Sequence, residues 1–217
     1  MTQIREPGQL IRIGVLIAAL AAIGGCRGLA FLAASEKQKN VQAECDKLGG
    51  RRVAVVVWAE PSTLDVYPLA QYHTARHVNY VFEVNRGRGE LKGTSFVSAT
   101  RVNDLQEQLG ANGPLLSNAD LAERLKVDIV IRIDLYEYTT RAPEANGLIK
   151  GRVSGNLAVQ RAGQVEPLYR TELSAGYPED SGIGLLDQSD DEVLNETMRR
   201  FADRVARKFY AHQVEYE

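Results

Sequence analysis

The run "VAVVVW" at Val53–Trp58 places the tightest limit on what this chain can fold into. It holds no polar residue, and most of its residues are β-branched, which favours a strand. A strand with no polar residue at alternate positions must be covered on both of its faces. The Gly49–Gly50 pair just before it indicates a turn. The run therefore predicts a fully buried strand with helices on either side of it.

The remaining segments divide into helical and strand-like patterns. They predict a helix over 68–84, a short strand at 94–99, helices at 100–110 and 118–126, and strands at 127–140, 148–160 and 165–177. The last three strands alternate apolar with polar residues, which is typical of an antiparallel meander with one covered face. We expect an α/β (α+β) fold with a mixed sheet of about five strands, covered by helices.

The C-terminal segment predicts a long amphipathic helix over 190–212. Its apolar residues recur every three or four positions and form one stripe, which consists of Leu194, Met198, Phe201, Val205 and Phe209. Acidic residues occupy the first turn and basic residues cluster near the end, an order that complements the helix dipole. We expect the stripe to pack onto the sheet.

The N-terminal segment joins a short basic region to the most apolar stretch of the chain. Arg5 and Arg12 are followed by Ile13–Ile23, which holds no charge. The tetrapeptide "IGGC" then ends at Cys26, with two small residues before the cysteine. A basic region, a short apolar region and small residues before a cleavage point are typical of a secretory signal.

The tetrapeptide "IGGC" resembles the lipobox of bacterial lipoproteins. In that family the cysteine thiol receives a diacylglycerol, and the signal is cleaved just before it. The resemblance implies that Cys26 carries lipid and begins the mature chain. A second interpretation stays open, because residues 13–34 are long enough to span a bilayer of about 30 Å as an uncleaved anchor. Arg27 and the Gly24–Gly25 pair disfavour such a span.

Both interpretations give the same domain organisation. The signal peptide covers residues 1–26, or an N-terminal anchor helix extends to about residue 34. A polar tether follows over 27–48, and a single extracytoplasmic α/β domain covers 49–217. Because Arg5 and Arg12 favour an N-terminus held inside, we expect the domain on the periplasmic or extracytoplasmic side of the membrane.

The charge balance excludes one class of partner. The chain has a formal net charge of −2. Residues 1–25 sum to +1 through Arg5, Arg12 and Glu6, so the remainder carries −3. A protein that binds nucleic acid needs a basic face that displaces counterions from phosphates. We therefore expect no nucleic acid among the partners.

Several longer segments carry a family resemblance, namely "KLGGRRVAVVV", "ADLAERLKVDIVIRIDLYEY", "GLIKGRVSGNLAVQ", "GYPED" and "FADRVARKFYAH". With the lipobox they resemble a group of lipoproteins from planctomycete genomes that have no assigned activity. The resemblance covers most of Leu48–His212, and "NRGRGELKGTSF" departs from it. More distantly, the chain is similar to the periplasmic α/β domains of curli-secretion and penicillin-binding-protein-activator lipoproteins, which act by binding other envelope proteins. This likeness implies a binding role and assigns no site residue.

The sequence offers few residues for catalysis or metal binding. His73 and His77 lie four apart and share one face of the predicted helix, as metal ligands require, but the glutamate of the zincin motif is missing between them. Arg76 beside them would repel a cation. Asp134 and Glu137 fall on opposite faces of a regular strand, so they do not form an acid/base pair.

These patterns predict a membrane-anchored, non-catalytic cell-envelope lipoprotein that acts through contacts with another envelope protein, without a cofactor. The alternative is an extracytoplasmic enzyme or metal-binding protein whose residues converge only in the folded chain. A cleft with perturbed titratable groups would favour that alternative, whereas an exposed apolar surface would favour protein contacts. With Cys26 lipidated, Cys45 has no cysteine partner, and we expect a small, partly buried residue there.

Overall fold

The computed structural model describes residues 38–145, 148–179, 185 and 188–215. The chain divides into two compact units, and the larger one is Gln42–His212. β1 (Gln38–Val41) and β7 (His212–Glu215) form a two-stranded sheet, and apart from His212 its residues belong to the smaller unit. The sequence predicted neither strand, because β1 lies in a polar segment and β7 begins at the end of the predicted C-terminal helix. Cys26 and the predicted signal or anchor lie outside the described residues.

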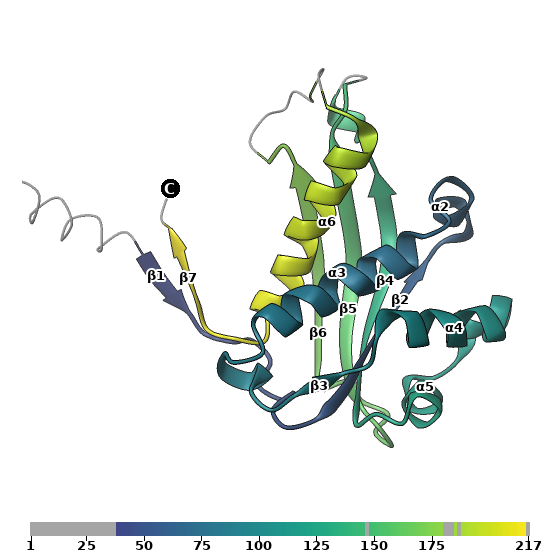
Figure 1. Ribbon diagram of the computed structural model, residues 1–217, viewed down its shortest axis with the longest axis vertical. Helices are drawn as coiled ribbons and strands as arrows, with labels where there is room; N and C mark the ends of the chain where they lie inside the picture. The colour runs from purple at the N-terminus through teal and green to yellow at the C-terminus, as the bar shows by residue number, and fades with distance from the viewer. Residues whose placement is uncertain (1–37, 146–147, 180–184, 186–187, 216–217) are drawn as a thin grey trace, which may run out of the picture. The chain divides into compact units, whose positions relative to one another are not determined.

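The larger unit is built on a five-stranded sheet with the order β3-β2-β4-β5-β6 (Figure 1). Its strands are β2 (Arg52–Ala59), β3 (Ser95–Phe96), β4 (Ile129–Thr139), β5 (Gly151–Arg161) and β6 (Tyr169–Tyr177). The β3, β2 and β4 strands run parallel, while β4, β5 and β6 form an antiparallel meander. The predicted mixed sheet of about five strands with a C-terminal meander is confirmed.

The central strand β2 is buried on both faces, as its sequence predicted. Val53, Val55 and Val57 belong to the larger apolar cluster on one face of the sheet. Ala54, Val56 and Trp58 belong to a smaller cluster on the other face. This division follows from the alternation of side chains along a strand.

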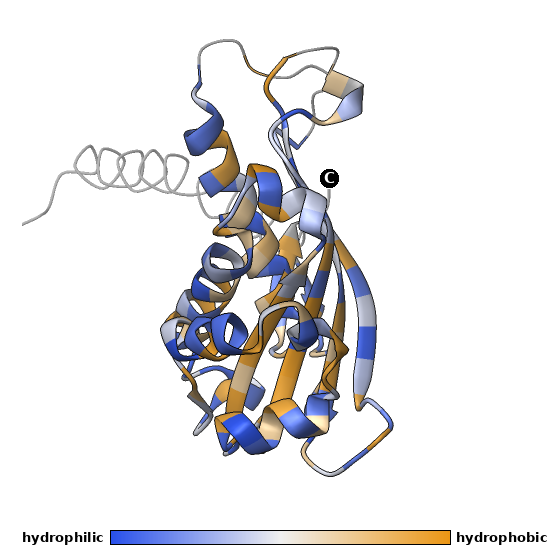
Figure 2. Cartoon of the chain, turned by 90° about the vertical axis from the view of Figure 1, so that its right-hand side faces the viewer, coloured by the Kyte–Doolittle hydropathy of each residue, from blue (hydrophilic) through white to orange (hydrophobic). Residues whose placement is uncertain are grey.

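The larger cluster lies beneath α3 (Ala70–Val84) and α6 (Asp190–Arg207), and we call this side of the sheet the α3/α6 face. From α6 it takes Met198, Phe201 and Val205, so the predicted stripe does pack onto the sheet. Figure 2 shows the helices turning hydrophobic residues toward the strands. The helix begins with a capping box at Ser189 and ends at Arg207. The prediction that it continues to His212 is wrong.

The smaller cluster lies beneath α4 (Ala99–Leu109) and α5 (Asn118–Leu125), on what we call the α4/α5 face. The Ser98 hydroxyl caps α4 and the Ser117 hydroxyl caps α5, each by accepting a hydrogen bond from a backbone N–H in the first turn. Short elements connect the larger ones: α2 (Pro61–Val66), η1 (Gly89–Leu91), η2 (Gly110–Leu115) and η3 (Pro143–Ala145). The sequence did not predict α2.

A β-bulge changes the facing of side chains near the end of β4. Leu135 pairs with Gly155, but Glu137 pairs with the adjacent Ser154, so Tyr136 is an extra residue. A bulge of this kind shifts the alternation by one position. As a result, Asp134 and Glu137 lie on the same face of the sheet. The prediction that they lie on opposite faces is wrong, because it assumed a regular strand.

The segment before β2 belongs to the packed unit. The N–H groups of Glu44 and Cys45 both donate to the carbonyl of Lys208 over 2.9 Å. Cys45 and Leu48 are buried in the larger cluster. The polar tether predicted for 27–48 therefore gives way to packed chain before residue 48, because two apolar side chains reach the core between charged neighbours that stay in solvent.

Candidate functional site

The candidate site lies where α3 and α6 pack side by side on the sheet. His73 and His77 occupy one face of α3, as their spacing predicted, and both line the space between the two helices. Two neighbouring depressions share these histidines and Asn195 of α6. We call the two together the α3–α6 groove.

The first depression has a volume of about 440 Å³ and is mostly apolar. Its apolar lining comes from α2, the connection between α2 and α3, α3, β4 and α6, and consists of Val66, Tyr67, Pro68, Leu69, Ala70, Tyr138, Leu194 and Met198. The rings of Tyr67 and Tyr138 meet edge-to-face with centroids 5.1 Å apart. Burial, followed by the field of Tyr67, raises the pKa of Tyr138, so its hydroxyl stays protonated at neutral pH.

A few polar side chains complete the lining of this depression. They are those of His73, His77, Asp191 and Asn195. An apolar pocket with a few polar groups at its edge is the usual form of a site that accepts an apolar group and fixes its orientation. The geometry therefore suits an apolar side chain more than a polar substrate.

The second depression has a volume of about 630 Å³ and continues along α3. Arg76, Tyr80 and Val81 line it from α3, and Glu192, Glu196 and Arg199 line it from α6. The groove thus has an apolar end and a mixed, charged end.

Exposed apolar side chains line the groove and continue beyond it along α3. Val66 is 67% exposed, Leu69 56%, Tyr80 68% and Val84 66%. Leu69, His73, His77, Tyr80 and Val84 recur at three or four positions, which places them along one side of α3. A soluble helix normally presents charged or polar residues on its outer side. This second stripe on α3 therefore marks a surface that another molecule can cover.

The imidazole of His77 is biased toward its neutral form. Partial burial lowers the pKa of His77, and the positive fields of His73 and Arg76 lower it further. A neutral pair of imidazoles can bind a metal, but a site needs further ligands. Within the described ranges, no group of three His, Cys, Asp or Glu side chains lies close enough to hold a metal ion.

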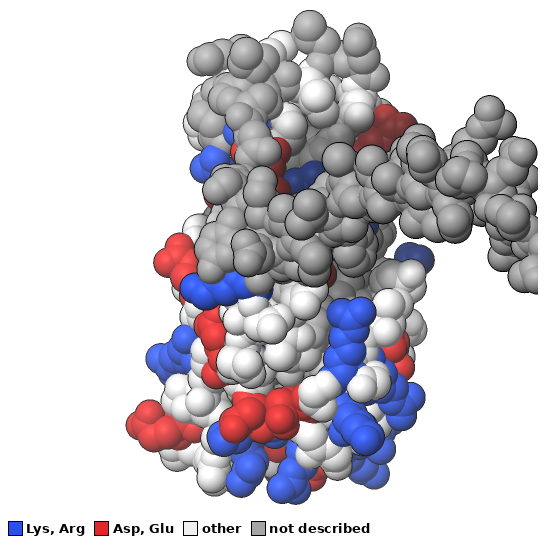
Figure 3. Space-filling model, turned by 90° about the vertical axis from the view of Figure 1, so that its left-hand side faces the viewer, with Lys and Arg blue, Asp and Glu red and all other residues white. Residues whose placement is uncertain are grey.

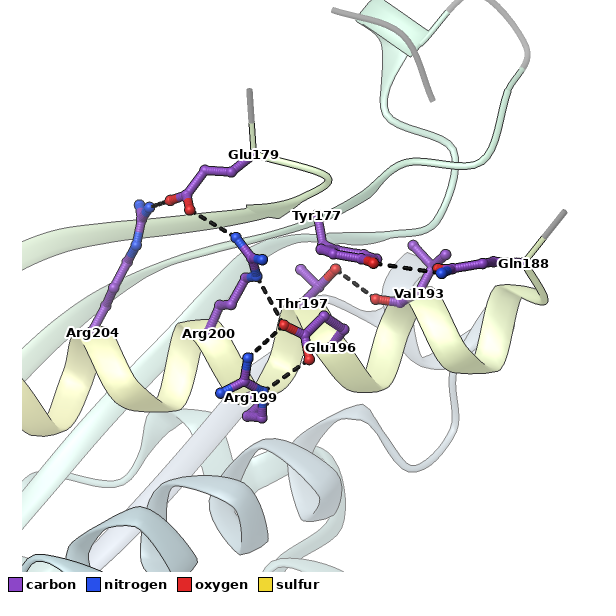
Figure 4. A network of polar contacts seen from close by, with 9 residues as sticks. All are labelled: Tyr177, Glu179, Gln188, Val193, Glu196, Thr197, Arg199, Arg200 and Arg204. Atoms are coloured by element: carbon purple, nitrogen blue, oxygen red, sulfur yellow. Dashed lines mark hydrogen bonds and ion pairs between the residues drawn. The ribbon is translucent and has the colours of Figure 1, made fainter. Parts of the chain in front are cut away.

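The α6 wall of the groove is held by an ion-pair network, drawn in Figure 4. Glu196 accepts hydrogen bonds from Arg199 at 2.6 and 2.8 Å and from Arg200 at 3.0 Å. Arg200 also donates to Glu179 over 2.7 Å and lies over the ring of Tyr177. The hydrogen bond from Arg199 is the main cause that lowers the pKa of Glu196 to about 2. A carboxylate held ionised in this way suits a rigid wall and not a general acid.

A separate depression, of about 720 Å³, lies on the α4/α5 face where helix coverage ends. Its floor includes Arg132 and Asp134 of β4, which form an ion pair at 2.9 Å. Beyond them, the Ser154 hydroxyl donates to Glu137 over 2.8 Å. The bulge thus gathers polar side chains onto one open face, but they are paired with one another.

Cys45 is not a reactive thiol in this fold. It is a free cysteine and is buried in the larger cluster. Burial is the main cause that raises the pKa of the Cys45 thiol, so the nucleophilic thiolate is disfavoured. The sequence led us to expect a small, partly buried residue here, and Cys45 is buried more completely than that.

The exposed stripe on α3 was missed in the sequence, although a signal for it exists. Leu69, Tyr80 and Val84 share the helical spacing of the two histidines, so the helix carries two apolar stripes instead of one. The α2 segment that supplies Val66 was also missed, and with it one end of the groove. Sequence alone could not show which stripe meets the sheet.

None of the helices in the described ranges combines the length and the apolar character needed to cross a membrane. The predicted span at 13–34 lies outside these ranges.

No family model matches the chain, and no curated protein matches it. Among solved structures, the PelC dodecamer from Paraburkholderia phytofirmans gives a TM-score of 0.45 at 7% identity, over 80% of this chain and 96% of that chain. Lipoprotein GNA1162 from Neisseria meningitidis gives 0.43 at 16% identity, over 71% and 97%. The LpoB C-terminal domain from Salmonella enterica gives 0.33 at 12% identity, over 60% and 87%. Such scores are too low to transfer a site residue or an activity.

Proposed function

We propose that this chain is a lipid-anchored cell-envelope protein that works through contacts with another envelope protein. Cys26 is the lipidated residue in this proposal, and the "IGGC" tetrapeptide behind an uncharged apolar run supports it. The arginines before that run support an extracytoplasmic location for the folded units. The α3–α6 groove and its apolar border are the contact surface.

The observation that carries the proposed contact surface is the exposed apolar stripe beside an apolar pocket. Leu69 and Val66 lie at the mouth of the pocket, and Tyr80 lies further along the same groove. Interfaces are commonly dominated by a few apolar or aromatic side chains that fill pockets, surrounded by a polar rim. The histidines, Asp191 and Asn195 supply such a rim here.

The chemistry of the groove favours binding over catalysis. Its most strongly perturbed carboxylate, Glu196, is fixed between two arginines. The pKa of His77 is lowered mainly by burial, and within the described residues no carboxylate is hydrogen-bonded to its ring to orient it as in a nucleophile–base pair. Glu196 and the histidines therefore shape the surface of the groove and do not form a catalytic pair.

The contact surface is tested by two matched substitutions in the full chain. Leu69→Asp places a charge at the pocket mouth, while Val165→Asp places the same charge at a position that is 88% exposed in the loop between β5 and β6. After cross-linking in membranes, the chain with Val165→Asp should retain the partner band of the unmodified chain. The chain with Leu69→Asp should lose it. Equal recovery from both variants would refute the groove as the contact surface.

The anchor is tested separately at Cys26. A thioether requires sulfur, so Cys26→Ser should abolish labelling by a fatty-acid probe. Mass spectrometry of the membrane fraction should find a chain that lacks residues 1–25 and carries diacylglycerol. If the membrane fraction instead contained an unmodified chain that keeps Ile13–Ile23, the protein would be held by an uncleaved anchor and not by lipid.

A further inference from the structure

The two edges of the five-stranded sheet differ in length. The β3 strand at one edge has only two residues, Ser95–Phe96. The β6 strand at the other edge has nine, Tyr169–Tyr177, and among the described strands it pairs only with β5. A long edge strand presents backbone N–H and C=O groups to which another strand can bind. Which groups of β6 point outward follows from the ladder.

Opposite residues of an antiparallel pair alternate between hydrogen-bonded and non-hydrogen-bonded. Asp128 lies opposite Ala162, one step before the Ile129–Arg161 pair, and the Ala162 N–H donates to the Asp128 carbonyl over 2.8 Å. By alternation, the even-numbered residues of β5 turn their backbone groups toward β4, and the odd-numbered residues turn theirs toward β6. Leu157 pairs with Thr171, so Thr171 faces β5. The backbone groups of Arg170 and Glu172, on either side of Thr171, then face outward.

An independent contact agrees with this assignment. Ser174 is also even-numbered, and its carbonyl accepts a hydrogen bond from the guanidinium of Arg204 on α6. Glu179 holds Arg204 in place (Figure 4). Arg204 thus covers the outer edge of β6 at Ser174 and limits strand addition to the stretch before it, around Arg170 and Glu172.

The side chains of that open stretch are complementary to themselves. Arg170 and Glu172 are both exposed and lie on the α4/α5 face of the strand. The Tyr136 hydroxyl donates to Glu172 and keeps its carboxylate over the sheet. Figure 3 views the chain from the left-hand side of Figure 1 and shows both acidic and basic side chains on the part of the surface that grey atoms do not cover. Charges of both signs therefore face any added strand.

We propose that β6 pairs antiparallel with β6 of a second copy of this chain, with the two-fold axis at Thr171. In this register Arg170 lies opposite Glu172 of the other copy, and the same pair repeats across the axis. An axis at Arg170 or at Glu172 would instead place like charges opposite each other. The outward backbone groups of Arg170 and Glu172 then form the hydrogen-bonded pairs, and the two sheets become continuous.

The same charges explain why a second copy fits better than an arbitrary strand. Charged side chains on an edge strand oppose pairing with apolar or like-charged segments. A strand pairs favourably with both charges only if it places an acid opposite Arg170 and a base opposite Glu172. The β6 strand of another copy provides this pattern. A lipid anchor would hold copies on one surface and raise their effective concentration, which favours such a short interface.

The proposal is tested by charge reversal in the full chain, purified in detergent micelles and followed by sedimentation velocity. The unmodified chain should dimerise with increasing concentration. Arg170→Glu or Glu172→Arg alone should weaken the dimer at least about tenfold, because each places like charges opposite one another twice. The double variant R170E/E172R should restore the unmodified affinity. Circular dichroism checks that each variant is folded.

Two controls and a second measurement complete the test. Arg101→Glu on α4 and Glu123→Arg on α5 make the same charge changes at exposed positions elsewhere and should leave the dimer unchanged. Thr171→Cys should give a disulfide-linked dimer on mild oxidation, because facing non-hydrogen-bonded residues lie about 4.5 Å apart at Cα. A chain that stays monomeric and forms no disulfide cross-link in the Thr171→Cys variant would overturn the proposal. So would a dimer that both single reversals leave unchanged.

Discussion

On the α3/α6 face of the sheet, apolar side chains are buried from Val55 on β2 to Leu173 on β6. On the α4/α5 face, the buried apolar side chains end within β4, between Val130 and Arg132. Helices cover the α3/α6 face across its whole width. On the α4/α5 face they cover only β2 and the start of β4, and the side chains on the rest of this face are polar. The comparison shows that coverage changes along a single strand.

The difference in helical coverage is visible in the sequences of the strands. In β2, which is covered twice, every residue from Val53 to Trp58 is apolar. In β6, covered once, exposed Arg170, Glu172 and Ser174 alternate with more buried residues. The apolar fraction of a strand thus reports how many helical layers cover it. Four substitutions can break or sharpen this comparison.

The largest effect is expected beneath α6. Phe201 is fully buried in the larger cluster, so Phe201→Ala should lower the free energy of unfolding by about 3–5 kcal/mol. Urea denaturation monitored by circular dichroism measures this change. Asn195→Ala, at an exposed position of the same helix, is the control and should have little effect. An unchanged midpoint for Phe201→Ala would contradict the packing of α6 on the sheet.

A smaller effect is expected on the covered half of the other face. Leu121 of α5 is fully buried in the smaller cluster, and Leu121→Ala should cost about 2–4 kcal/mol. The same denaturation measurement compares it with Phe201→Ala. If Leu121→Ala lowered the free energy of unfolding no more than a surface substitution does, α5 would not be covering this half of the sheet.

The ion pairs on α6 should give a modest, pH-dependent effect. The pKa of Glu196 is lowered to about 2 in the folded chain from 4.5, so its contribution is complete above pH 4.5 and is lost as the pH falls toward 2. Allowing for solvent screening, the contribution is on the order of 1 kcal/mol. Glu196→Gln should therefore destabilise the chain near neutral pH, and the difference from the unmodified chain should shrink in that acidic window. A difference that stays constant with pH would exclude the ion pairs as its source.

The smallest effect is expected on the open half of the α4/α5 face. Asn156 of β5 is exposed there, and Asn156→Lys should change the free energy of unfolding by less than about 0.5 kcal/mol. A cost comparable to that of Leu121→Ala would show that another part of the chain covers this half. The result would then reduce the contrast between the two halves.

The main features of the fold could be predicted because they depend on local periodicity. The continuous run at Val53–Trp58 and the stripe through Phe201 each imply which surface is buried. The same reasoning could not detect that Cys45 and Leu48 enter the core, because isolated apolar residues among charges have no period. It also could not find the end of α6 at Arg207, since Phe209 continues the helical spacing although the chain has already left the helix.

The candidate site was predictable only in part. The spacing of His73 and His77 correctly placed them on one face of α3, but a period does not tell which neighbours share that face. The groove exists because α2 and α6, distant in sequence, both border α3. Its apolar pocket is therefore a product of tertiary packing, and so is the exposure of Leu69.

The bulge at Tyr136 also affects how β4 can change in length. In a regular strand, gaining or losing one residue turns every later side chain to the opposite face. Here Tyr136 is already the surplus residue, so a chain without it would join Leu135 to Glu137 in normal alternation and leave Tyr138 facing the core. This strand can therefore lose one residue at the bulge, a change in length of the kind that protein families usually confine to their loops.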